Sequence, residues 1–141
     1  MNSRIFLSQS DAKQIAEAAE REALKNNWMV SIAIVNDAGQ LIFFSKMDGS
    51  TNASVDVSIA KAKHAANYRR DTKFHEELLI QRNHAVLSLP GFLPIEGGVL
   101  LTYRSIHVGA IGVSGVASKD DGQIAGAGVA FFNNSVQNDI I

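Results

Sequence analysis

One basic stretch of the sequence concentrates the side chains best suited to chemistry. It carries Lys61, His64 and Tyr68, followed directly by the pair Arg69-Arg70. Residues three and four apart share one face of a helix, so the first three side chains are expected to lie together. A histidine ring nitrogen can bind a metal ion, and the cations suit a carboxylate-bearing ligand. A solvated helix end with scattered charges explains the same residues, so both interpretations stay open.

Glu96 is the second candidate, because it lies in a constrained loop. Pro94 precedes it and Gly97-Gly98 follow it. Binding and catalytic residues concentrate in such loops, and a partly buried glutamate can act as a general base. Capping of a turn explains Glu96 equally well, so its role also stays open.

Several classes of site are disfavoured by the remaining patterns. The chain has no cysteine, which excludes disulfides, thiolate metal sites and a cysteine nucleophile. The four histidines lack the spacing of a zinc motif, and we interpret His107 as a packing or hydrogen-bonding residue on a strand. The glycines between Gly109 and Gly115 do not open a helix after a strand, so we assign them to close packing rather than nucleotide binding.

The composition favours a small globular protein that binds neither nucleic acid nor membranes. The net charge is −1 and only 7% of the residues are aromatic, so neither a basic surface nor a stacking platform is expected. The N-terminus becomes polar before an apolar signal segment can form. We therefore expect a cytoplasmic protein with no membrane-spanning segment.

The length of 141 residues indicates a single domain over residues 1–141. Hydrophobic periodicity and turn residues predict an α+β fold, with a mostly antiparallel sheet made of two hairpins and helices packed on it. In the helix over 52–70, Val55, Ile59, Ala62 and Ala66 form the expected core-facing stripe. The expected helices cover residues 8–26, 52–70, 72 to about 88, and 118 to about 131. Ser118 with Asp121 is expected to cap the last of these helices, and the tail after Asn133 is expected to fray. The expected strands cover residues 29–35, 41–45, 99–103 and 106–114.

Three parts of the chain resemble the GlcG/HbpS-like family, also called the haem-degrading-domain family. The first runs from Glu22 through Trp28 into Val30–Gly39, and the second is Ile59–Ala66. The third joins Glu96–Val99 to Val108–Gly115. The likeness covers most of residues 8–132 and is strongest to short cytoplasmic members linked to aromatic catabolism. Many members have threonine where this chain has His64, so the side-chain atom available to bind iron differs.

The resemblance implies a profilin-like fold and assembly into symmetric homo-oligomers. Several members bind haem, and others belong to pathways for glycolate or aromatic compounds. We therefore expect this chain to bind haem or another small acid-bearing ligand in a pocket at or near a subunit interface, with His64 as the iron ligand. The alternative is an accessory enzyme acting on a small organic acid. The expected ligand-binding residues are Lys61, His64, Tyr68, Arg69 and Glu96.

Overall fold

The computed structural model describes residues 1–138 and confirms the α+β fold. Each predicted strand is present, and the predicted helices are present with changed bounds. In chain order the elements are α1 (Gln9–Lys25), β1 (Ser31–Asn36), β2 (Leu41–Lys46), α2 (Ala53–Tyr68), α3 (Thr72–Ile80), the 3-10 helix η1 (His84–Ser88), β3 (Gly98–Tyr103), β4 (Ile106–Ser114) and α4 (Ser118–Asn138). No helix within the described residues is long and apolar enough to cross a membrane.

The sheet has four strands in the order β2-β1-β4-β3, and all neighbouring strands are antiparallel. Both predicted hairpins are therefore confirmed. The β1–β2 turn forms because the Asn36 side-chain oxygen accepts the backbone N–H groups of Ala38 and Gln40, each at 3.0 Å. Gly39 completes the turn with a φ of 75°, a conformation that glycine adopts without steric cost.

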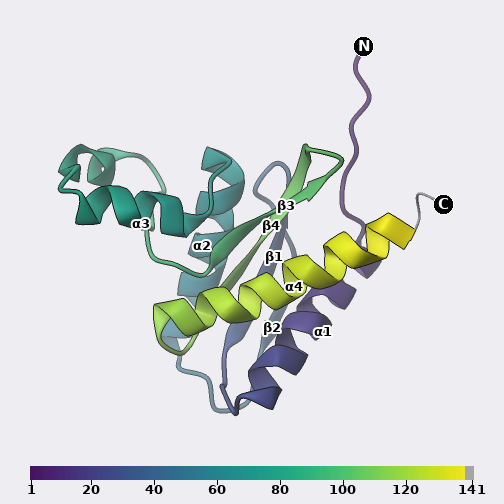
Figure 1. Ribbon diagram of the computed structural model, residues 1–141, viewed down its shortest axis with the longest axis horizontal. Helices are drawn as coiled ribbons and strands as arrows, with labels where there is room; N and C mark the ends of the chain where they lie inside the picture. Colours follow the sequence, from purple (N-terminus) through teal and green to yellow (C-terminus); the bar gives the residue numbers. More distant parts are fainter. Residues whose placement is uncertain (139–141) are drawn as a thin grey trace.

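Helices cover both faces of the sheet, as Figure 1 shows. Helices α1 and α4 lie side by side on one face, where Ile32 and Ile34 of β1 join the larger apolar core. Helix α2 covers the other face, where Ala33 and Val35 meet a smaller, alanine-rich core. Alternate residues of a strand point to opposite faces, so the unbroken apolar run of β1 is buried on both sides.

Small residues let α2 approach the sheet closely. A Cβ atom added at Gly112 of β4 would clash with the Ser58 carbonyl oxygen and lie 2.6 Å from the Ala62 backbone nitrogen. These neighbours are helix backbone, which cannot move independently of α2. We expect Gly112→Ala to lower the free energy of unfolding by about 1–3 kcal/mol, measured by urea denaturation.

Gly126 of α4 provides the matched control for Gly112→Ala. It is exposed, and a Cβ atom there would have no heavy atom within 4 Å. Gly126→Ala should raise the free energy of unfolding by about 0.5–1 kcal/mol, because alanine loses less backbone entropy in a helix. Equal effects at the two positions would contradict the close packing of α2 on β4.

The structure corrects the expected bounds of two helices. The helix expected over 72 to about 88 ends at Ile80, because Arg82 takes a left-handed φ of 65°, and the chain resumes as η1. Helix α4 continues past the expected end near Phe131 to Asn138, since Phe132 is buried in the larger core. The residues after Asn133 therefore stay helical to 138, and the last three residues of the tail lie outside the described residues.

The expected buried stripe of α2 was only partly right. Ala62 and Ala66 are buried, but Val55 and Ile59 are half-buried. The face that contains Lys61 and His64, which lies outside this stripe, is also buried. The buried residues of α2 are Ser54, Ser58, Lys61, Ala62, His64, Ala65 and Ala66. Helix α2 is thus covered by the sheet and by the segments that follow it in the chain.

Candidate functional site

The structure divides the predicted site residues among separate places. His64 and Tyr68 lie together in an aromatic cluster with two residues that the sequence analysis did not assign, His75 and Phe92. Lys61 and Glu96 lie beside the start of α4, and Arg69 borders a cavity at the end of α2.

The aromatic cluster joins α2, α3 and the loop before β3. His64 is fully buried, and its ring centroid lies 4.5 Å from that of Phe92 and 4.9 Å from that of His75. Tyr68 borders the same rings, and its hydroxyl group donates a hydrogen bond to the Pro90 carbonyl oxygen. The cluster therefore fixes α3 and the loop against α2.

Both ring nitrogens of His64 take part in hydrogen bonds. The Leu93 backbone N–H donates to Nδ1 of His64 at 2.8 Å, so this nitrogen carries no proton. The proton of a neutral imidazole must then be on Nε2, which lies 2.8 Å from Nδ1 of His75. His64 therefore donates to His75, and neutral His75 must in turn keep its proton on its own Nε2. The Leu93 contact thus sets the tautomer of both rings.

Both histidines are neutral at neutral pH. Burial, with a smaller effect of His75, lowers the pKa of His64 to about 4. Burial and the charge of Arg70 lower the pKa of His75 from its ordinary value. Nε2 of His75 has no hydrogen-bond partner among the described residues and is not among their buried unpartnered atoms. His75 as a whole is 8% exposed, so the pair leaves one N–H donor with limited access from the surface, which suits a carboxylate or carbonyl oxygen.

The surroundings of this N–H group are aromatic and basic. The ring of Phe74 is 45% exposed and its centroid lies 5.2 Å from that of His75. The Arg70 guanidinium lies 5.0 Å above the Phe74 ring, a cation–π arrangement. We call the surface formed by Arg70, Phe74 and His75 the His75 face.

Lys61 is held in a buried ion pair. Its Nζ donates to Asp121 Oδ2 at 3.1 Å and to the Val113 carbonyl oxygen at 3.0 Å, and the lysine is 1% exposed. Asp121 also accepts the Val116 backbone N–H, so its carboxylate does not form the expected cap with Ser118. Burial raises the pKa of Asp121, and the Lys61 charge opposes that rise. These contacts give Lys61 a structural role, while ligand binding by Lys61 stays a prediction.

Glu96 lies against the first turn of α4. A Cβ atom at Gly122 would clash with its carboxylate, so the glycine makes room for this side chain. The Glu96 backbone N–H lies 3.5 Å from Glu76 Oε1. Glu96 is half-buried and apart from the histidine cluster, and its role in ligand contact stays a prediction.

Arg69 borders a cavity of about 470 Å³ at the end of α2. It ends the helix in the left-handed conformation, with a φ of 52°. The cavity also contacts His107, which we expected to pack or to form hydrogen bonds. Both its ring nitrogens are buried and have no hydrogen-bond partner among the described residues, so only the packing alternative agrees with the structure. No spacing in the sequence brings Arg69 and His107 together, so only the fold reveals this pair.

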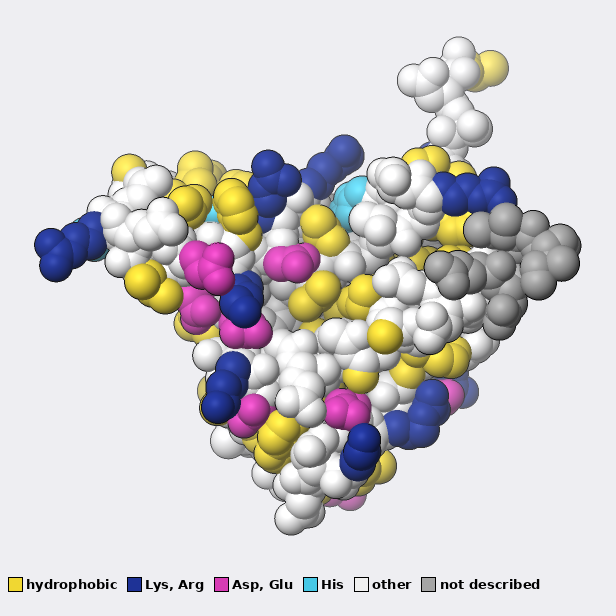
Figure 2. Space-filling model, in the orientation of Figure 1, with side chains coloured by type: hydrophobic (Ala, Val, Ile, Leu, Met, Phe, Trp, Pro, Cys, Tyr) yellow, Lys and Arg dark blue, Asp and Glu magenta, His cyan; other side chains and the backbone are white. Residues whose placement is uncertain are grey.

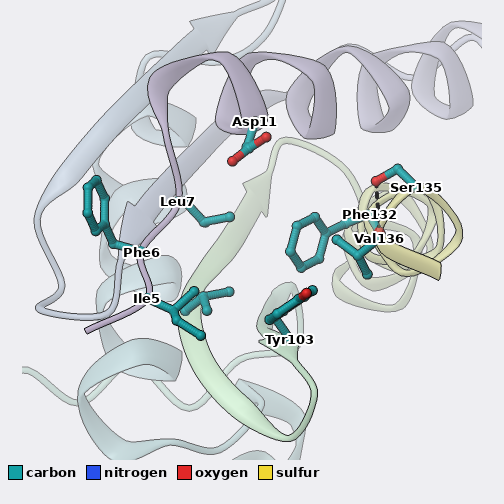
Figure 3. Close-up of a pocket in the computed structure, with 9 residues that line it drawn as sticks. Ile5, Phe6, Leu7, Asp11, Tyr103, Phe132, Ser135 and Val136 are labelled. Carbon is teal, nitrogen blue, oxygen red and sulfur yellow. Dashed lines mark hydrogen bonds between the residues drawn. The ribbon is translucent and has the colours of Figure 1, made fainter. Parts of the chain in front are cut away.

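A further cavity of about 230 Å³ lies between the N-terminal segment, β4 and the end of α4 (Figure 3). Leu7, Phe132 and Val136 point toward it. Its acidic residue, Asp11, is already used in the capping box of α1, where it accepts the Ser8 backbone N–H at 3.1 Å. Apolar side chains outnumber polar ones around this cavity, and neither of the two cavities is bordered by His64 or His75.

The fold and these sites define a small α+β protein with a neutral histidine pair. Residues 7–130 match the family model described as "Haem degrading protein HbpS-like". The chain is 40% identical over 114 residues to Protein GlcG of Escherichia coli, covering 81% of this chain and 85% of that protein. It therefore belongs to the GlcG/HbpS-like family.

Solved structures support the same assignment. A double mutant of Streptomyces reticuli HbpS superposes with a TM-score of 0.85 at 31% identity, covering 93% of this chain and 90% of that one. The crystal structure of a PduOC:heme complex superposes with a TM-score of 0.80 at 23% identity, covering 89% of this chain and 94% of that one. At that identity the second likeness concerns the fold alone.

The donor atoms of the histidine pair do not fit direct ligation of haem iron in this arrangement. A ring nitrogen needs a free lone pair to bind iron. The lone pair on Nδ1 of His64 accepts the Leu93 N–H, and Nε2 carries the proton that is donated to His75. The N–H group of His75 fits a carboxylate instead. Iron ligation by His64 stays a prediction that requires the Leu93 contact to break.

Proposed function

We propose that this protein binds haem or another planar, acid-bearing molecule on the His75 face. The observation that supports this most directly is the Nε2–H of His75, which has no partner among the described residues and is fixed by the Leu93–His64–His75 chain of hydrogen bonds. An acid group of the ligand would accept this hydrogen bond beside the Arg70 guanidinium. The exposed ring of Phe74 offers apolar surface to a flat ligand.

We place this face near a contact between copies of the chain. Helix α3 and η1 project from the sheet, and hydrophobic side chains gather at this end of the molecule (Figures 1 and 2). Exposed apolar surface on one projecting segment is typical of an interface. The exposed large hydrophobic residues of this region are Phe74, Ile80, Leu87, Leu89 and Ile95. We therefore propose that the protein forms a homo-oligomer in the cytoplasm. Light scattering that gives a particle of 15.2 kDa, the mass of one chain, would contradict this.

Titration with hemin tests the ligand site. His75→Ala should weaken binding about tenfold, since one hydrogen bond to a charged group is lost. His84→Ala is the matched control, because His84 is an exposed histidine on η1. Its affinity should equal that of the wild type. If His75→Ala binds hemin as tightly as His84→Ala, the His75 face is not the site.

The absorption spectrum of bound hemin separates the two roles of His64. With acid binding at His75, His64→Thr weakens binding and leaves the Soret position unchanged. A Soret shift in wild type that is lost in His64→Thr would instead support iron ligation by His64. Mass spectrometry of molecules retained after native purification would identify an acid other than haem.

The alternative proposal is an accessory enzyme acting on a small organic acid. Glu96 is half-buried beside α4 and is the carboxylate we proposed as a general base. His64 and Lys61 are the other candidate acid–base groups of this alternative. His64 is fully buried, and Lys61 is bound to Asp121 and is 1% exposed. The histidine pair supports ligand binding more directly, so binding is the function we favour.

A further inference from the structure

The cavity beside Arg69 is separate from the His75 face and has its own polar chemistry. It lies between the N-terminal segment, the β1–β2 turn, the end of α2 and the β3–β4 turn. Its volume is about 470 Å³, within the range of small-molecule sites. The residues that border it are Ser3, Arg4, Ile5, Asp37, Arg69, Ser105, Ile106 and His107.

His107 is the unusual residue of this cavity. Both its ring nitrogens are buried, and neither has a hydrogen-bond partner among the described residues. Buried polar atoms in native proteins are nearly always paired, so an unpaired one calls for a specific explanation, such as a bound water, an ion or a ligand. Burial and the charge of Arg69 lower the pKa of His107, against the opposite effect of Asp37. The neutral ring offers one N–H donor and one lone pair.

The charges around the cavity leave one cation for a ligand. Arg4 and Asp37 neutralise each other through a bidentate pair, in which Nε lies 2.7 Å from Oδ2 and Nη2 lies 2.7 Å from Oδ1. Arg69 forms no ion pair among the described residues. A guanidinium group matches the geometry of a carboxylate, so Arg69 supplies the charge that a small acid requires.

We propose that this cavity binds a small monocarboxylate that carries a hydroxyl or oxo group next to its carboxylate. Arg69 binds the carboxylate, and the His107 ring turns to bring one of its buried nitrogens to the neighbouring oxygen. The hydroxyl of a hydroxy acid can donate to the free lone pair of the ring, whereas the oxygen of an oxo acid can accept its N–H. The site depends on neither haem nor the His75 face.

Lactate, pyruvate and propionate form a matched set of probes for this site. They share a three-carbon carboxylate, and only propionate lacks the second oxygen. Titrations of about 1 mM acid followed by ¹H–¹⁵N NMR should shift the Arg69 and His107 signals, with lactate or pyruvate binding at least about tenfold more tightly than propionate. The absence of shifts with all three acids would overturn the proposal.

Two substitutions assign the roles within the cavity. Arg69→Gln should weaken binding of all three acids about tenfold, and Arg70→Gln is the control, because this neighbouring arginine does not border the cavity. His107→Leu should remove the preference for lactate and pyruvate over propionate. Equal losses in the two arginine variants, or a preference that survives His107→Leu, would overturn the assignment. Since His75→Ala should leave acid binding unchanged, failure of hemin binding and failure of this site are distinguishable.

Discussion

Replacing Lys61 with methionine is expected to lower the free energy of unfolding by about 3–5 kcal/mol. The lysine is 1% exposed, and its Nζ lies 3.1 Å from Asp121 Oδ2. Methionine keeps most of the side-chain length but removes the charge, which leaves the Asp121 carboxylate buried without its cation. Urea denaturation at neutral pH measures the loss.

A second substitution shows whether the unpaired charge causes this loss. In Lys61→Met with Asp121→Asn, no charge remains, and the asparagine oxygen can still accept the Val116 N–H that Asp121 accepts at 3.1 Å. We expect this pair to recover at least half of the lost stability. Lys63→Met is the surface control, because Lys63 is exposed, and it should change stability by no more than about 0.5 kcal/mol. Equal effects of Lys61→Met and Lys63→Met would contradict a stabilising ion pair.

The fold could be predicted where local signals and tertiary packing agree. Ser8 followed by Asp11 is the sequence pattern of a helix N-cap, and the capping box forms, with the Asp11 N–H donating to Ser8 Oγ at 3.0 Å. Turn residues 36–39 and the apolar run of β1 also give the first hairpin correctly. In these segments the hydrogen bonds lie within a few residues, so the local sequence contains the necessary information.

The helix bounds differ where tertiary contacts override local preference. Asparagines at 133 and 134 favour an early end of α4, yet the helix continues to Asn138. Burial of Phe132 against the larger core stabilises this last part of α4. Conversely, the apolar periodicity after Thr72 suggests one continuous helix, but Arg82 is left-handed and separates α3 from η1.

The site was harder to predict because its partners are distant in sequence. Asp121 is 60 residues from Lys61, and Leu93 is 29 residues from His64. Helical spacing correctly placed His64 near Tyr68, but it could not reveal which groups would use its ring nitrogens. The same limit applies to His107, whose lack of partners depends on the packing of several separate segments.

The buried state of His64 also leads to a large expected pH effect. An unfolded histidine takes up a proton near pH 6.5, whereas folded His64 does so only near pH 4. Between these values the unfolded chain holds more protons, so acid favours unfolding. The stabilisation from neutral His64 is complete above about pH 6.5 and is lost as the pH falls toward 4. The lowered pKa corresponds to about 3 kcal/mol.

The difference in stability between wild type and His64→Gln isolates this effect. Glutamine does not titrate, and its amide can accept from the Leu93 N–H and donate to His75. His75 and His107 remain in both proteins, so their own titrations largely cancel in the difference. From pH 7 to pH 4, urea denaturation should show wild type losing about 3 kcal/mol more than His64→Gln. If the free energies of unfolding of wild type and His64→Gln fall equally with pH, folded His64 takes up its proton near pH 6.5, as an unfolded histidine does. The Leu93 contact would then not hold the ring neutral.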